Sequence, residues 1–209
     1  MFRGFSWTIA SRKRFFLYNF LPFGITSGPY IFTKLLRPLT TYWRAQGIKI
    51  AVYLDDGAGM EGCKLLAEKH AAVVESTLAH AGFTVNSAKS LWQPVQHLTW
   101  LGVTIDTKEN KLYISARRVN RIKGIIHKLL SCKRTSARQI AKFTGSIIST
   151  KFVLGDVTSL RTRFLYKLIQ RSKTWDSLFS LHNCVNAKAE VLFWHKMFQT
   201  LNHKPIKRH

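Results

Sequence analysis

The chain has 209 residues, of which 46% are hydrophobic, and its 33 Lys and Arg against 10 Asp and Glu give a formal net charge of +23. This length suits one large domain or two small ones, and this charge predicts a polyanionic partner, nucleic acid before an anionic membrane surface. No apolar run reaches the roughly 20 residues of a membrane span, so we expect no membrane-spanning segment. Three lone cysteines, Cys63, Cys132 and Cys184, exclude a complete disulfide framework and favour a reducing intracellular compartment.

Up to about residue 115 the sequence predicts strands mixed with helices. The expected strands are residues 2–7, 14–20, 49–54, 83–85, 97–105 and 112–115, and the expected helices are residues 26–46 and 61–81. Pro38 lies inside the first helix and should kink or split it. Because Asp-Gly is a common hairpin-turn dipeptide, Asp56 and Gly57 predict a turn followed by a short return strand through Met60.

The rest of the chain predicts helices only, at residues 117–131, 136–150, 157–171 and 187–201. Ser136 and Gln139 have the spacing of a capping box at the start of the second of these helices. The order of elements therefore predicts an α+β fold in which a mixed part precedes an all-helical part.

The charge is concentrated in this helical part, where residues 111–209 hold 21 basic and three acidic residues. The first predicted helix is amphipathic, with Val119, Ile122, Ile126 and Leu129 at helical spacing. Its remaining positions include five bases, Arg117, Arg118, Arg121, Lys123 and Lys128. A solvated surface helix usually carries both signs, and no acid lies between residues 111 and 153, so we favour a face that contacts a polyanion.

Two adjacent acids, Asp55 and Asp56, follow the predicted strand 49–54 in a chain that has few other acids. Carboxylates fixed side by side on a hairpin are a good site for Mg²⁺ or Mn²⁺, which prefer oxygen ligands. Taken alone, the segment Asp55-Asp56-Gly57 fits a simple polar β-turn equally well.

Four segments in order resemble motifs of reverse transcriptases, the RNA-directed DNA polymerases. "LPFGITSGPYIFTKLLRPL" resembles their motif B, "YLDD" their metal-binding motif C, "GFTVNSAKS" their motif D, and "LTWLGVTID" the motif E region that grips the primer. The combination looks most like retrotransposon enzymes of the DIRS-like or gypsy-like kinds, DIRS-like by preference. The resemblance is strongest over residues 15–106 and weaker in the helical part.

The resemblance implies a role for each matching position. Asp55 and Asp56 would be catalytic metal ligands, and Lys89 would be a candidate proton donor to pyrophosphate or, equally, an ordinary surface lysine. Phe23, Gly24 and Tyr53 would lie near the incoming deoxynucleotide triphosphate, and Trp100, Leu101 and Gly102 would form the primer-grip turn. The five bases from Arg117 to Lys128 would hold the backbone of an RNA or DNA template–primer.

The same resemblance implies a partial polymerase palm at residues 1–115, a helical thumb-like region at 116–172 and a helical connection at 173–209. A third metal-binding aspartate, in motif A, should precede motif B, but no Asp or Glu occurs before Asp55. We therefore expect a fragment that lacks motif A and the fingers and is inactive, or nearly so, as a polymerase alone. The alternatives are a non-catalytic nucleic-acid-binding remnant and a product that never folds stably. Cytoplasmic and nuclear locations are both compatible with the family.

Overall fold

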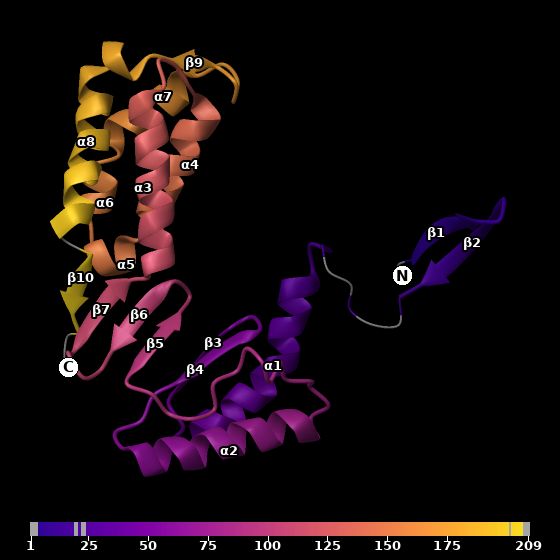
Figure 1. Cartoon of the computed structure of the whole chain (residues 1–209). Helices are drawn as coiled ribbons and strands as arrows, with labels where there is room; N and C mark the ends of the chain where they lie inside the picture. The colour runs from indigo at the N-terminus through magenta and orange to yellow at the C-terminus, as the bar shows by residue number, and fades with distance from the viewer. Residues whose placement is uncertain (1–3, 19–20, 22–23, 201, 207–209) are drawn as a thin grey trace. The chain divides into compact units, whose positions relative to one another are not determined.

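The computed structural model describes residues 4–18, 21, 24–200 and 202–206, with the side chain of Gln199 not described. It divides the chain into two compact units, Met1–Pro94 and Val95–His209. Helices and antiparallel sheets occur together in it (Figure 1), which confirms the predicted α+β class. The predicted boundary at residue 115, between a palm and a thumb-like region, is a division by function. A division by contacts does not test it, so it stays a prediction.

Within its described residues, the first unit contains two β-hairpins and two long helices. Its elements are β1 (Gly4–Ile9), β2 (Arg12–Leu17), α1 (Gly28–Ala45), β3 (Ile50–Tyr53), β4 (Asp56–Gly59) and α2 (Lys64–His80). α1 continues through Pro38 as one helix, so the proline does not split it. Its buried core is small: Trp43 of α1 packs with Ile48 and with Val74 of α2.

Both helices of the first unit end in the same way. Gly82 follows α2 with a φ of +80°, and Phe83 donates its backbone N–H to Leu78 O at 3.0 Å. This Schellman arrangement commits the Phe83 N–H to closing the helix, so it cannot join a strand. The predicted strand at residues 83–85 is therefore wrong, and the structure has no regular element there.

The hairpin of β1 and β2 is fully exposed along both strands. Its turn residues, Ala10 and Ser11, have φ values of 47° and 63°, as a two-residue type I′ turn requires. Phe5 stacks on Phe16 across the strands, with ring centroids 5.2 Å apart. Strand pairing and cross-strand aromatic contacts therefore hold this hairpin together, without a buried core on either face.

The second unit combines a four-stranded antiparallel sheet, in the order β10-β7-β6-β5, with a helical bundle (Figure 1). The sheet strands are β5 (His97–Trp100), β6 (Val103–Asp106), β7 (Lys111–Ile114) and β10 (His203–Pro205). The helices are α3 (Ala116–Ser131), α4 (Ala137–Ile148), α5 (Lys151–Leu154), α6 (Val157–Leu160), α7 (Arg163–Arg171), η1 (Leu181–Asn183) and α8 (Val185–Thr200). A short pair, β8 (Thr135–Ser136) and β9 (Leu178–Phe179), lies between helices.

The core of the second unit is large. Side chains from α3, α4, α7 and α8 form one continuous buried cluster in which Ile122, Phe143, Leu165 and Trp194 are fully buried. The predicted capping box is confirmed, since Ser136 Oγ accepts the Gln139 backbone N–H and the Gln139 side chain accepts that of Ser136. No helix within the described residues is long and apolar enough to cross a membrane.

Two expected elements of this unit are each divided. The strand predicted at 97–105 is the hairpin β5–β6, and the helix predicted at 157–171 is interrupted between α6 and α7. At this break Trp194 Nε1 donates to Arg161 O at 2.7 Å, and the buried Glu190 carboxylate accepts the backbone N–H groups of Phe164 and Leu165 at 3.0 Å. Side chains on α8 therefore form the hydrogen bonds that the backbone loses at the break. No local sequence pattern predicts these contacts.

The C-terminal segment returns to the sheet. β10 pairs antiparallel with β7, with His203 opposite Tyr113, and Lys204 Nζ lies 4.4 Å from the centre of the Phe152 ring. The sequence predicted only helix in this region, so β8, β9 and β10 are additions to the predicted fold.

Candidate active site and nucleic-acid interface

The two aspartates lie at the tip of the β3–β4 hairpin. Tyr53 pairs with Asp56, so the turn consists of Leu54 and Asp55, and the predicted turn at Asp56 and Gly57 is wrong by two residues. Leu54 takes up the left-handed φ of 54° that the turn needs, a conformation that costs a non-glycine residue about 1 kcal/mol. Both carboxylates are exposed, and within the described part of the chain neither has a hydrogen-bond or ion-pair partner.

The other end of this hairpin is anchored by Glu61. Its Oε1 accepts the backbone N–H of Lys49 at 3.2 Å and lies 2.8 Å from His70 Nδ1 of α2. The hydrogen bond with His70, followed by the one from Lys49, holds the pKa of Glu61 below its ordinary value. The four residues of β3, Ile50–Tyr53, lie between Lys49 and the turn, so Glu61 lies roughly 13 Å from the turn and does not extend the pair of aspartates.

The pair fits a divalent metal in its chemistry but not in its number of ligands. Adjacent unpaired carboxylates offer the hard oxygen donors that Mg²⁺ and Mn²⁺ prefer. Among the described residues, however, no group of three His, Cys, Asp or Glu side chains could hold a metal. The sequence has no acid before Asp55, and Glu61 is held at the other end of the hairpin, so Asp55 and Asp56 are the two carboxylates that the hairpin offers at its turn.

Three other positions assigned to the catalytic and nucleotide site, Gly24, Tyr53 and Lys89, are exposed. Tyr53, 60% exposed, precedes the turn, and Gly24 has a φ of +84° with open space where a side chain would begin. Lys89 is exposed and lies in a turn, where its backbone N–H donates to Asn86 O. Phe23 lies outside the described residues.

The predicted primer grip is the turn between β5 and β6 in the second unit. Trp100 pairs with Val103, so Leu101 and Gly102 form the β5–β6 turn, with φ values of 48° and 77°. The Gly102 carbonyl accepts the backbone N–H of Ser115, which precedes α3, at 3.2 Å. Trp100 Nε1 is buried and has no hydrogen-bond partner among the described residues.

Of the five bases predicted to face a polyanion, Arg118 differs from the rest. Its guanidinium donates to Leu101 O at 3.4 Å and to Ser149 O at 3.3 Å. The other four, Arg117, Arg121, Lys123 and Lys128, are exposed and have no acidic partner in the part of the chain that the structure describes. Unpaired exposed cations are free to contact phosphate.

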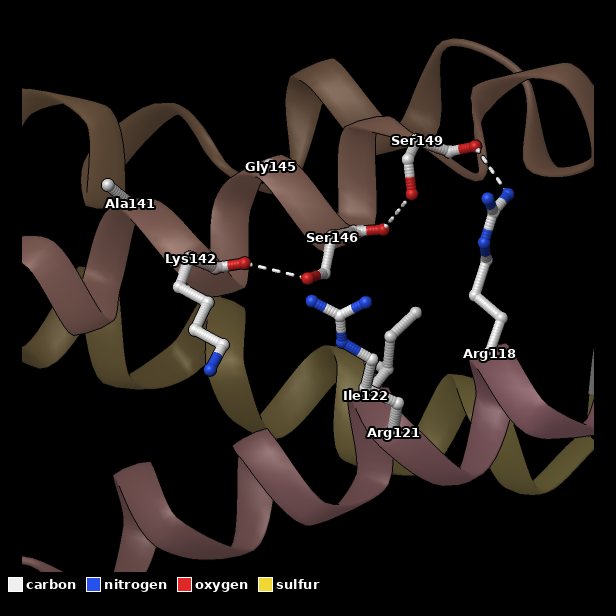
Figure 2. Close-up of a pocket in the computed structure, with 8 residues that line it drawn as sticks. All are labelled: Arg118, Arg121, Ile122, Ala141, Lys142, Gly145, Ser146 and Ser149. Carbon is white, nitrogen blue, oxygen red and sulfur yellow. Dashed lines mark hydrogen bonds between the residues drawn. The ribbon is translucent and has the colours of Figure 1, made fainter. Parts of the chain in front are cut away.

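A groove of about 430 Å³ runs between α3 and α4 (Figure 2). We call it the α3–α4 groove, and its lining residues are Arg118, Arg121, Ile122, Ala141, Lys142, Gly145, Ser146 and Ser149. Figure 2 shows the cationic ends of Arg121 and Lys142 reaching into the space between the helices. No acidic residue lines it, so its charge suits an anionic ligand.

The α4 side of the groove was not predicted. Ala141, Gly145 and Ser149 recur every four residues and therefore share one face of the helix. A side chain at Gly145 would meet nothing within 4 Å, so the helix backbone is open to close approach there. The small-residue spacing in the sequence was the available signal, but on its own it also fits ordinary helix packing.

Comparison with known proteins finds a family that resembles just under half of the chain. Residues 3–105 match the reverse transcriptase (RNA-dependent DNA polymerase) family. The match includes the β3–β4 hairpin with its two aspartates and both strands of the β5–β6 hairpin up to Ile105. This part of the chain is therefore similar to reverse transcriptase domains. No curated protein matches the chain.

Solved reverse transcriptase structures share the fold over most of the chain. The foamy viral protease-reverse transcriptase dRH, in complex with double-stranded DNA, matches with a TM-score of 0.67 and 19% identity over 91% of this chain and 31% of that one. The foamy viral protease-reverse transcriptase with an RNA/DNA hybrid gives 0.64 and 19%, over 90% and 24%. The chain thus spans less than a third of the length of these proteins.

Proposed function

We propose that this chain is the palm-and-thumb part of a retrotransposon reverse transcriptase, DIRS-like or gypsy-like, with template-directed DNA synthesis as its family chemistry. The observation that carries the proposal is the reverse transcriptase match over residues 3–105, within which two unpaired aspartates lie at a hairpin tip. The deoxynucleotide triphosphate is proposed to lie near Gly24, Phe23 and Tyr53, with Lys89 as the proton donor. We place the protein inside the cell, in the cytoplasm, the nucleus or both.

Asp55 and Asp56 are proposed to hold Mg²⁺ or Mn²⁺. When bound, such ions supply activation of the primer 3′-hydroxyl and neutralisation of the pyrophosphate leaving group. The contribution of the chain is to fix two carboxylates at a turn whose base is anchored by Glu61 and His70. Because no third carboxylate precedes Asp55, we propose that the chain alone is inactive or nearly so.

The second unit is proposed to bind the template–primer. Supporting this, residues 111–209 hold 21 bases against three acids, and the α3–α4 groove has no acidic lining. Cations on α3 and Lys142 on α4 would contact phosphates without reading sequence, and the small residues of α4 would allow close approach of the sugar-phosphate backbone. The related foamy viral structures contain double-stranded DNA and an RNA/DNA hybrid, which makes these the ligands to test.

Primer extension by the full chain tests the polymerase part of this proposal. The assay uses a primed homopolymer RNA template with Mg²⁺ and then Mn²⁺, beside a variant with Asp55→Ala and Asp56→Ala. We expect extension by the chain to be no greater than by the variant, while both still bind the template–primer. Extension that the variant loses would contradict the proposed inactivity and would show that a third ligand exists.

A second candidate function is binding without catalysis, as a domesticated remnant. It is favoured by the charge of the second unit, which needs no contribution from the aspartates. Providing a motif A segment in trans, as a separate chain that carries the missing aspartate, separates the two candidates. Restored extension supports the polymerase fragment, and continued binding without extension supports the remnant.

A further inference from the structure

We propose that Arg118 is a positioning residue, which fixes the β5–β6 turn to the end of the α3–α4 groove instead of contacting phosphate. Its consequence for nucleic-acid binding rests on the proposed function, but the contact itself exists in the free chain and can be tested there.

Arg118 connects three elements through one guanidinium group. Nη2 donates to Leu101 O in the turn, and Nη1 donates to Ser149 O at the C-terminal end of α4. The side chain itself begins on the first turn of α3. Two different nitrogen atoms make the two bonds, which requires the planar fork of arginine; the single ammonium of lysine cannot reproduce that geometry.

Gly102 provides the space that this contact occupies. A Cβ atom built on Gly102 would lie 2.5 Å from both Cζ and Nη2 of Arg118, closer than any real contact. Since these atoms end a flexible side chain, an alanine at position 102 would displace the guanidinium from its place. The glycine is also needed for its φ of +77°. A backbone hydrogen bond, donated by the Ser115 N–H to Gly102 O, also holds the turn.

The same contact aligns the turn with the groove. Ser149 is the last of the small α4 residues that line the α3–α4 groove, and Leu101 is the exposed tip of the turn. Because Arg118 bonds to both, the turn cannot shift along the groove without losing a hydrogen bond. A duplex whose sugar-phosphate backbone contacts the groove would therefore meet the turn in one fixed position, which is what a primer grip requires.

Hydrogen exchange on the full chain, without nucleic acid, tests the contact directly. We expect Arg118→Lys and Arg118→Ala each to speed exchange of the amides of Trp100 and Val103, which pair across the β5–β6 turn, by about tenfold, the effect of losing one or two hydrogen bonds to the turn. Amides of α8 should be unchanged in both, which shows that the effect is local. Arg117→Ala, at the neighbouring exposed base, should leave the turn unchanged.

Gly102→Ala completes a double-mutant cycle. Because alanine already displaces the guanidinium, adding Arg118→Ala to Gly102→Ala should speed exchange much less than it does in the unaltered chain. Equal effects in the two backgrounds, or no effect of Arg118→Lys on the turn, would overturn the proposal.

Binding of an RNA/DNA hybrid, measured against salt, distinguishes positioning from phosphate contact. We expect Arg118→Lys to weaken binding severalfold without changing the slope of log affinity against log salt, since no phosphate contact is lost. Full affinity in Arg118→Lys with a slope lowered by about one in Arg118→Ala would mean a phosphate contact and would overturn the proposal. If the unaltered chain fails to bind, the proposed function fails, while the exchange result still decides whether the contact exists.

Discussion

The two units differ most in how well they are packed. In the described part of the first unit the buried cluster comprises three residues, Trp43, Ile48 and Val74, whereas that of the second comprises sixteen. The first unit instead exposes large apolar side chains along β1, β2 and α1, including Trp7, Phe15 and Tyr30.

The proposed metal-binding residues therefore lie in the unit with the smaller buried core. The aspartates stand on the thinly packed unit, whose hairpin is held at its base by a hydrogen-bonded Glu61, while the proposed nucleic-acid interface stands on the well-packed one. Regions with few buried apolar contacts open at low free energy. We therefore expect the first unit to open before the second, and the following predictions test that ranking from the largest effect to the smallest.

We expect the largest difference in stability between alanine substitutions at two phenylalanines, one in each unit. Phe143 is fully buried in the second unit, and Phe16 in the β1–β2 hairpin is 38% exposed. We expect Phe143→Ala to lower the free energy of unfolding of the second unit by about 3–5 kcal/mol, and Phe16→Ala to lower that of its own unit by about 1 kcal/mol or less. Urea unfolding with hydrogen exchange on both variants measures this. Equal losses would remove the contrast between the units.

Glu190 tests how the break between α6 and α7 is stabilised. Its buried carboxylate accepts two backbone N–H groups, so Glu190→Gln replaces one accepting oxygen by a donor. We expect a loss of about 2 kcal/mol in the same measurement. Glu75→Gln, on an exposed position of α2, serves as the control and should change stability by less than about 0.5 kcal/mol. A Glu190 effect as small as the control would show that the two bonds contribute little.

Two tryptophans of the second unit test the unpaired donor beside the β5–β6 turn. Trp194 Nε1 donates to Arg161 O, whereas buried Trp100 Nε1 has no partner among the described residues. We expect Trp194→Phe to cost about 2 kcal/mol and Trp100→Phe to stay within about 1 kcal/mol of the unaltered chain, because removing an unpaired donor offsets the lost apolar contact. A large loss at Trp100 would indicate a bound water or another partner at its nitrogen.

Acid should weaken the first unit through Glu61. Since folding lowers the pKa of this carboxyl, its contribution is fully present above the ordinary value of 4.5 and is lost as the pH falls through the folded pKa. The stability difference between the unaltered chain and Glu61→Gln should therefore shrink below that pH. Unfolding curves at pH 6 and at decreasing acid pH compare the two, and a constant difference would contradict this sign.

Local patterns predicted most of the fold but not the contacts between distant residues. The amphipathic spacing of α3 and the capping box at Ser136 are local signals, and the structure confirms both. The break before α7 and the strand β10 depend on residues up to about ninety positions away, such as Tyr113 and His203. No pattern within a single element records such pairing.

The site divides in the same way. The "YLDD" stretch placed both aspartates at a hairpin, although the turn falls at Leu54 because strand pairing, rather than the Asp-Gly dipeptide, sets it. The basic face of α3 was visible from charge alone, yet the sequence did not distinguish Arg118 from its neighbours. That distinction comes from the Leu101 and Ser149 carbonyls, which only the folded unit brings to the guanidinium.

The most direct test of the account is the affinity of the full chain for an RNA/DNA hybrid, measured across salt concentrations. Three proteins are compared: the unaltered chain, Asp55→Asn with Asp56→Asn, and Arg121→Glu with Lys142→Glu. We predict salt-dependent binding that the aspartate changes preserve and the charge reversals in the α3–α4 groove reduce by at least about tenfold. Binding that survives the charge reversals, or that requires the aspartates, would contradict the separation of the two units into a metal-binding hairpin and a nucleic-acid interface.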